Sequence, residues 1–259
     1  MEKEFFENRR GQKIAVLIEQ PESPRGLAFV MHGLGGFKEQ PHIKTFADAF
    51  FENKYTVVRF DVVHSFGESE GGLYEDACLT NYYEDLQDVI QWSKSQNWYQ
   101  EPFVLAGHSL GGISTTLFAQ DHTEIVKGLA PISTTVSGEL SLESPEYKRV
   151  GEMWEKTGWL VQESKSVPGR IKRLKYAYVE DRLKYDVLLN ARKLTMPVLM
   201  IVGSEDQPTP PEHQKIFYEE IPGIKELHII EGAPHTFRDQ RHLDQVKKYF
   251  DNWIKNELD

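Results

Sequence analysis

Short apolar runs alternate along most of the chain with segments of helical periodicity. The runs, such as residues 55–60, are rich in β-branched and aromatic residues and are typical of strands covered on both faces. The other segments space apolar residues three and four positions apart, as in Ile43, Phe46 and Phe50, which predicts helices with one apolar face. We expect a hairpin at residues 5–8 and 13–19, strands at residues 26–31, 55–60, 103–106, 125–133, 197–202 and 226–230, and helices near residues 43–51, 82–90, 113–120, 211–221 and 243–253.

This alternation predicts the fold class. Strands that alternate with helices are joined by right-handed crossovers, so we expect an α/β fold whose mostly parallel sheet is covered by helices on both faces. The pattern breaks between residues 137 and 195, which are rich in charged and aromatic residues. We therefore predict a core of residues 1–136 and 196–259. Residues 137–195 would be an insertion above the carboxyl edge of the sheet, where such folds bind ligands, or else a helical excursion without contact to the site.

Composition and charge narrow the classes of partner. The chain has 259 residues and a net charge of −10, whereas nucleic acids and anionic membranes are bound by basic surfaces, so neither is an expected partner. The single cysteine, Cys78, excludes an internal disulfide and gives no metal cluster, so no metal is expected. Neither a signal peptide nor a run of membrane-spanning length is visible, which favours a cytoplasmic protein unless a secretion signal has been removed. The oligomeric state is left open.

One glycine-rich turn has the residues of a nucleophile. Residues 107–111 read Gly-His-Ser-Leu-Gly and lie between an expected strand and an expected helix. G-x-S-x-G in that context is the pattern of a nucleophile elbow, a strained turn that lifts the serine hydroxyl above the sheet edge. The spacing therefore predicts Ser109 as a nucleophile. The alternative is a solvated serine in a glycine-rich turn.

A serine nucleophile needs a base, which is itself oriented by a third group. Nine histidines compete for this role. The chain order nucleophile, acid, histidine, which elbow-type hydrolases share, selects His235 in the loop after the last expected strand. The acid should follow the preceding strand, where Glu205 and Asp206 are adjacent. Asp206 is preferred because a short carboxylate on a tight turn could reach Nδ1 of the base. Glu205 is the alternative, and both could be solvated loop charges.

Acyl transfer also needs donors for an oxyanion. The residue after the nucleophile supplies one backbone N–H, which assigns Leu110. A second donor should come from the glycine-rich loop of residues 32–36, where glycines allow the backbone to approach a substrate closely. We expect the Leu34 N–H to be that donor.

With these residues identified, the chain resembles the α/β-hydrolase superfamily, and within it the small serine esterases that include cinnamoyl and feruloyl esterases. The resemblance implies a Ser109–His235–Asp206 triad, hydrolysis of carboxylic esters, no cofactor, and a lid formed by residues 137–195. Relatives often have Gly-His-Gly where this chain has residues 64–67, so contacts there are not carried over. The matching segments are residues 32–34, 60–61, 67–71, 107–111, 203–206 and 235–237.

The substrate is the least determined feature. Aromatic residues of the 137–195 segment could form an acyl pocket, although aromatic side chains also pack within a lid. With the resemblance, they favour a small-molecule ester of an aromatic, feruloyl- or cinnamoyl-type acid. The alternatives are a short-chain acyl esterase, a thioesterase, an amidase, or a non-catalytic protein that binds a ligand. The candidate pocket residues are Tyr147, Trp154, Trp159, Tyr176 and Tyr178.

Overall fold

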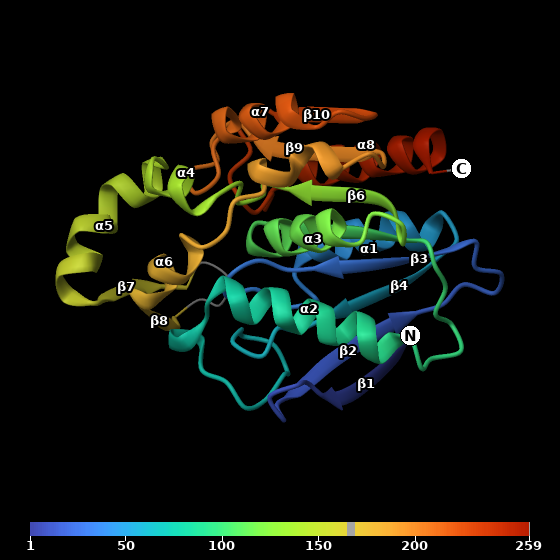
Figure 1. Cartoon of the computed structure of the whole chain (residues 1–259), viewed down its shortest axis with the longest axis horizontal. Helices are drawn as coiled ribbons and strands as arrows, with labels where there is room; N and C mark the ends of the chain where they lie inside the picture. The colour runs from blue at the N-terminus through green and yellow to red at the C-terminus, as the bar shows by residue number, and fades with distance from the viewer. Residues whose placement is uncertain (165–168, 259) are drawn as a thin grey trace.

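An eight-stranded sheet forms the centre of the computed structural model, which describes residues 1–164 and 169–258 (Figure 1). The strand order is β1-β2-β4-β3-β5-β6-β9-β10. β1 and β2 pair antiparallel to their neighbours, whereas all pairs from β4 to β10 are parallel, which confirms the mostly parallel sheet. The strands are β1 (Glu2–Glu7), β2 (Lys13–Glu19), β3 (Gly26–Met31), β4 (Tyr55–Phe60), β5 (Phe103–His108), β6 (Val126–Ile132), β9 (Val198–Gly203) and β10 (Lys225–Ile230).

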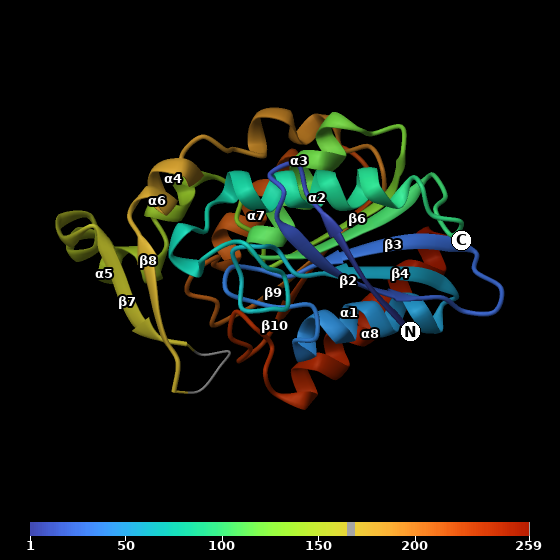
Figure 2. The same cartoon turned by 90° about the horizontal axis from the view of Figure 1, so that it is seen from below.

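Helices cover both faces of the sheet (Figure 2). α1 (Pro41–Glu52) and α8 (Gln240–Glu257) pack on one face, and α2 (Leu79–Ser93), α3 (Leu110–Asp121) and α7 (Pro211–Glu220) pack on the other. The central strands β3, β4 and β5 are buried along their whole length, as expected for strands between two helical layers. Within the described residues, no helix is both long and apolar enough to cross a membrane.

Most of the 137–195 segment lies beyond the carboxyl ends of the parallel strands, at the left of Figures 1 and 2. It contains two antiparallel strands that the sequence pattern does not predict. They are short and charged, and each has one buried side chain, Leu160 in the first and Leu174 in the second, so the strand signal is weak. Residues 165–168 of the segment lie outside the described residues. Its elements are α4 (Gly138–Leu142), α5 (Pro145–Thr157), β7 (Trp159–Glu163), β8 (Ile171–Lys175), α6 (Ala177–Arg182) and the 3₁₀ helix η2 (Leu188–Lys193).

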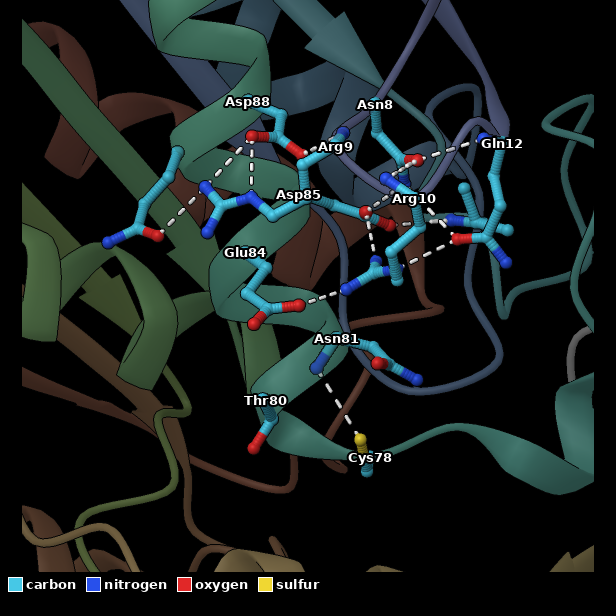
Figure 3. Close-up of polar contacts among 12 residues, drawn as sticks. Asn8, Arg9, Arg10, Gln12, Cys78, Thr80, Asn81, Glu84, Asp85 and Asp88 are labelled. Carbon is cyan, nitrogen blue, oxygen red and sulfur yellow. Dashed lines mark hydrogen bonds and ion pairs between the residues drawn. The ribbon is translucent and has the colours of Figure 1, made fainter.

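The turn of the N-terminal hairpin is bonded to α2 through Asp85 (Figure 3). This buried carboxylate accepts hydrogen bonds from Asn8 Nδ2 at 2.8 Å, Arg10 Nη2 at 2.6 Å and the Val63 backbone N–H at 2.9 Å. Burial raises the pKa of Asp85, and these donors offset only part of that effect. The network fixes the start of the loop after β4, and Tyr74 of this loop lines the cavity described below.

Candidate active site

Ser109 lies in a sharp turn between β5 and α3. Its backbone has φ +56° and ψ −112°, a conformation that residues with a side chain rarely adopt, so the turn is strained. A Cβ at position 107 would meet the Gly111 backbone, and one at position 111 would lie 2.6 Å from the His32 carbonyl oxygen. The packing of the turn therefore requires the glycines of the motif. The Ser109 N–H donates to the Ile132 carbonyl at 3.0 Å, which attaches the turn to β6.

His235 and Asp206 meet above the ends of β9 and β10. Nδ1 of His235 lies 2.8 Å from Oδ2 of Asp206. The loops that hold them are bonded together, because the Glu205 backbone N–H donates to the Ala233 carbonyl at 3.0 Å. Gly203 at the end of β9 packs so tightly against that carbonyl that a Cβ would not fit. Of the two adjacent carboxylates, Asp206 is thus the one bonded to His235.

The Asp206 carboxylate is buried and bonded through both oxygens. Oδ1 accepts the Thr209 backbone N–H at 2.8 Å, and Oδ2 lies 3.0 Å from the Thr209 hydroxyl in addition to His235. Burial alone would raise the pKa of Asp206, but the charge and hydrogen bond of His235 and the Thr209 N–H outweigh it and lower the pKa. An ionised Asp206 accepts hydrogen bonds only, so it places a proton on Nδ1 of His235.

The loop after β3 approaches the elbow closely. A Cβ at Gly33 would lie 2.9 Å from Ser109 Cβ, so only glycine permits this approach. Leu34 follows and lines the same cavity as Ser109. Leu110 is the first residue of α3, where backbone N–H groups have no acceptor within the helix. Both predicted N–H donors therefore belong to segments that adjoin Ser109.

A buried lysine holds this loop. Lys38 Nζ lies 2.7 Å from Asp61 Oδ2, and neither side chain is exposed. Glu68 and Glu39 approach the same ammonium at 2.5 and 3.1 Å. Burial lowers the pKa of Lys38, but the hydrogen bonds to Asp61 and Glu68 outweigh it and raise the pKa. The three carboxylates are close enough to bind a cation, and the Lys38 ammonium fills that position.

A cavity of about 450 Å³ lies beside Ser109 and His235. Three of the five predicted aromatic residues line it, namely Tyr147, Trp154 and Tyr178. The rings of Trp154 and Tyr178 are nearly parallel, with 5.9 Å between centroids and 11° between planes. The 137–195 segment thus contributes an aromatic part of the cavity wall.

The other two aromatic residues, Trp159 and Tyr176, are not among the described residues that line the cavity, so their assignment to the pocket is corrected. Trp159 stacks against Arg173 on the outer face of the β7–β8 hairpin, 4.3 Å from the guanidinium. The Tyr176 hydroxyl lies 3.1 Å from that of Tyr147, and its ring meets the edge of Trp154. Tyr176 therefore supports lining residues and does not itself line the cavity.

Residues 22–183, more than half of the chain, match the model of the Hydrolase_4 family, described as serine aminopeptidase, S33. The chain belongs to this α/β-hydrolase family. The family contains serine hydrolases and esterases, which agrees with a serine at the elbow and a histidine–carboxylate pair beside it.

Relatives of this Hydrolase_4 chain match most of its length. An uncharacterized 31.7 kDa protein from the traX-finO intergenic region of Escherichia coli is 26% identical, with 97% of this chain and 99% of that protein covered. Human protein ABHD12B is 27% identical over 73% of this chain and 48% of its own length. The structure of Est1E from Butyrivibrio proteoclasticus with ferulic acid bound superposes with a TM-score of 0.81 at 24% identity, covering 98% and 99% of the two chains. This likeness shows a shared fold.

Sequence reasoning missed Thr209 and Lys38. Thr209 contacts both Asp206 and Nδ1 of His235, the latter at 3.3 Å, and its hydroxyl also lies 2.9 Å from the Ser133 carbonyl. Its position three residues after an aspartate, within a proline-rich turn, is the signal that could have identified it, because Asp side chains bond nearby backbone N–H groups in turns. No local pattern marks Lys38, because two of its partners, Asp61 and Glu68, follow a different strand, β4.

Proposed function

We propose that this Hydrolase_4 protein hydrolyses carboxylic esters through an acyl-enzyme on Ser109. The observation that supports this most directly is the 2.8 Å contact of His235 with the buried Asp206 at a cavity that Ser109 also lines. A base oriented by a carboxylate beside a strained elbow serine is the arrangement that activates a hydroxyl. Simple ligand binding requires neither the strained turn nor the oriented histidine.

The chemistry follows from these positions. Ser109 Oγ attacks the ester carbonyl carbon while His235 Nε2 takes its proton. The tetrahedral oxyanion accepts hydrogen bonds from the Leu34 and Leu110 backbone N–H groups. Collapse breaks the C–O bond, and His235 returns the proton to the leaving alcohol. Water then attacks the acyl-enzyme by the same route, and Asp206 stabilises the imidazolium in both halves.

Ser109→Ala tests this assignment. It should lower kcat on short p-nitrophenyl esters by about four to six orders of magnitude while the protein stays folded. A fluorophosphonate probe should label Ser109 in the parent but not in His235→Ala. Folded parent that is not labelled would favour a ligand-binding protein. Matched amide and thioester substrates separate an esterase from an amidase or thioesterase.

We further propose that residues 137–195 act as a lid and that the acyl group is aromatic. Trp154 and Tyr178 both line the cavity, so a planar acyl chain bound there can contact their rings. Ferulic acid bound to Est1E, a protein of the same fold, supports this choice. The lid assignment includes residues 165–168, which lie outside the described residues.

A matched pair of variants tests the aromatic acyl group. Trp154→Leu should lower the preference for methyl ferulate over methyl butyrate in kcat/KM by about tenfold or more, because one hydrophobic contact in a pocket is worth about 1–3 kcal/mol. Trp159→Leu, on the outer face of the same segment, should leave the preference unchanged. A parent enzyme that prefers butyrate, or two variants that behave alike, would leave only the general esterase assignment.

A further inference from the structure

The elbow contains a second polar side chain, His108, directly before Ser109. Nε2 of His108 lies 2.7 Å from the backbone carbonyl oxygen of His235, across 127 positions of the chain. A carbonyl oxygen only accepts hydrogen bonds, so Nε2 of His108 must hold the proton. The bond therefore joins the turn that presents Ser109 to the main chain of the residue that would be its base.

The surroundings of His108 keep this donor in place. The residue is only 2% exposed, and its ring centroid lies 4.5 Å from that of His42 and 4.6 Å from that of His235. Burial, followed by the charge of His235, lowers the pKa of His108 to about 3, so the ring is neutral at neutral pH. Because it is confined and neutral, it can donate without adding a positive charge next to His235.

Other hydrogen bonds of the His235 loop connect it to a different segment, the turn after β9. Glu205 N–H donates to Ala233, and Gly232 N–H donates to Ser204 Oγ at 2.8 Å. Both bonds tie the loop to the turn after β9, which presents Asp206. They fix the base relative to the acid. The His108 bond fixes the base relative to the nucleophile.

We propose that His108 is a positioning residue. Its Nε2–H···O=C bond to His235 holds the base at a fixed distance and orientation relative to Ser109. This inference rests on the proposed function, since it assigns His235 the role of base. The placement of the base matters because an error of about 1 Å in the position of reacting groups can lower the rate about a hundredfold.

Two substitutions of equal length isolate the bond. In His108→Gln the amide nitrogen is as many bonds from Cα as Nε2 of histidine, so it can donate to the same carbonyl. His108→Met has the same reach but no donor. We expect His108→Met to lose about a hundredfold in kcat with KM unchanged, and His108→Gln to stay within about threefold of the parent. The rate of Ser109 labelling by a small fluorophosphonate should fall in parallel, since it depends on the base but on little substrate binding.

Equal kinetics in the two variants would overturn the inference, as would a loss confined to KM, because His108 also lines the cavity and could contact substrate. If His108→Met does not fold, the inference is tested on the parent protein instead. Its imidazole NMR spectrum should contain an Nε2–H proton protected from exchange at neutral pH, absent in His108→Gln, and lack of that signal refutes the bond. Full activity of Ser109→Ala would instead refute the proposed function, which keeps the two failures distinct.

Discussion

Replacing Asp206 with asparagine should move the imidazole proton of His235 from Nδ1 to Nε2. The Thr209 backbone N–H at 2.8 Å from Oδ1 needs an acceptor, so the amide oxygen of the new side chain must occupy the Oδ1 position. The amide NH₂ then occupies the Oδ2 position, 2.8 Å from Nδ1 of His235. An NH₂ group can only donate, so Nδ1 becomes the acceptor and the proton moves to Nε2.

An imidazole protonated on Nε2 cannot take the proton of Ser109. A comparable change of tautomer in a Ser-His-Asp enzyme costs about 10⁴ in kcat, which corresponds to about 5.4 kcal/mol of activation free energy at 1.36 kcal/mol per decade. We expect a loss of this size for Asp206→Asn on a p-nitrophenyl ester at saturating concentration. Because the side chain keeps its shape and its bond to Thr209, KM should change little.

Glu205→Gln is the matched control, since it removes the neighbouring carboxylate that sequence reasoning kept as an alternative acid. Its side chain is exposed, and we expect kcat within about threefold of the parent because exposed charges contribute little. The reasoning is refuted if Asp206→Asn retains more than about a tenth of the parental kcat, or if Glu205→Gln loses as much as Asp206→Asn.

Three further outcomes follow from the geometry. Lys38→Met should lower the free energy of unfolding in urea by about 3–5 kcal/mol, because it leaves the buried Asp61 without its partner. Gly33→Ala should lower kcat about ten- to a hundredfold, because the new methyl group would press on Ser109 Cβ at 2.9 Å and displace the loop. The pKa of Asp206 lies below its ordinary value of 3.8 in the folded state, so its ionisation stabilises the fold above about pH 4 and this contribution is lost as the pH falls through the folded pKa. Thermal unfolding of Asp206→Asn should consequently depend less on pH below about 4 than that of the parent.

Each outcome has a control or a contrary result. Lys3→Met removes an exposed partner of Glu68 and should cost less than about 1 kcal/mol, so equal losses for Lys3→Met and Lys38→Met would contradict the burial argument. Gly33→Ala must keep the parental circular dichroism spectrum, and unchanged kcat would show that the loop yields without cost. If thermal unfolding of the parent and of Asp206→Asn depends on pH in the same way, the lowered pKa of Asp206 is excluded.

The parallel sheet and the nucleophile elbow could both be predicted from local patterns in the sequence. The alternation of apolar runs with helical periodicity predicted the parallel sheet because periodicity reflects which faces are covered. The elbow was recognisable because its strained turn needs glycines close to Ser109 in the sequence. The φ of +56° at Ser109 shows this strain. The β7–β8 hairpin was missed because its strands are short and each has a single buried side chain.

Tertiary structure alone decided the relations between segments. Sequence ordered Asp206 and His235 along the chain, but their 2.8 Å contact depends on how two loops pack at the sheet edge. Composition could not distinguish Trp154 in the cavity wall from Trp159 on the outer face, because aromatic rings gain free energy by burial on either side of a segment. The bond from His108 to the His235 carbonyl joins residues 127 positions apart. Such contacts depend on distances in the folded chain, which a pattern of neighbouring residues does not encode.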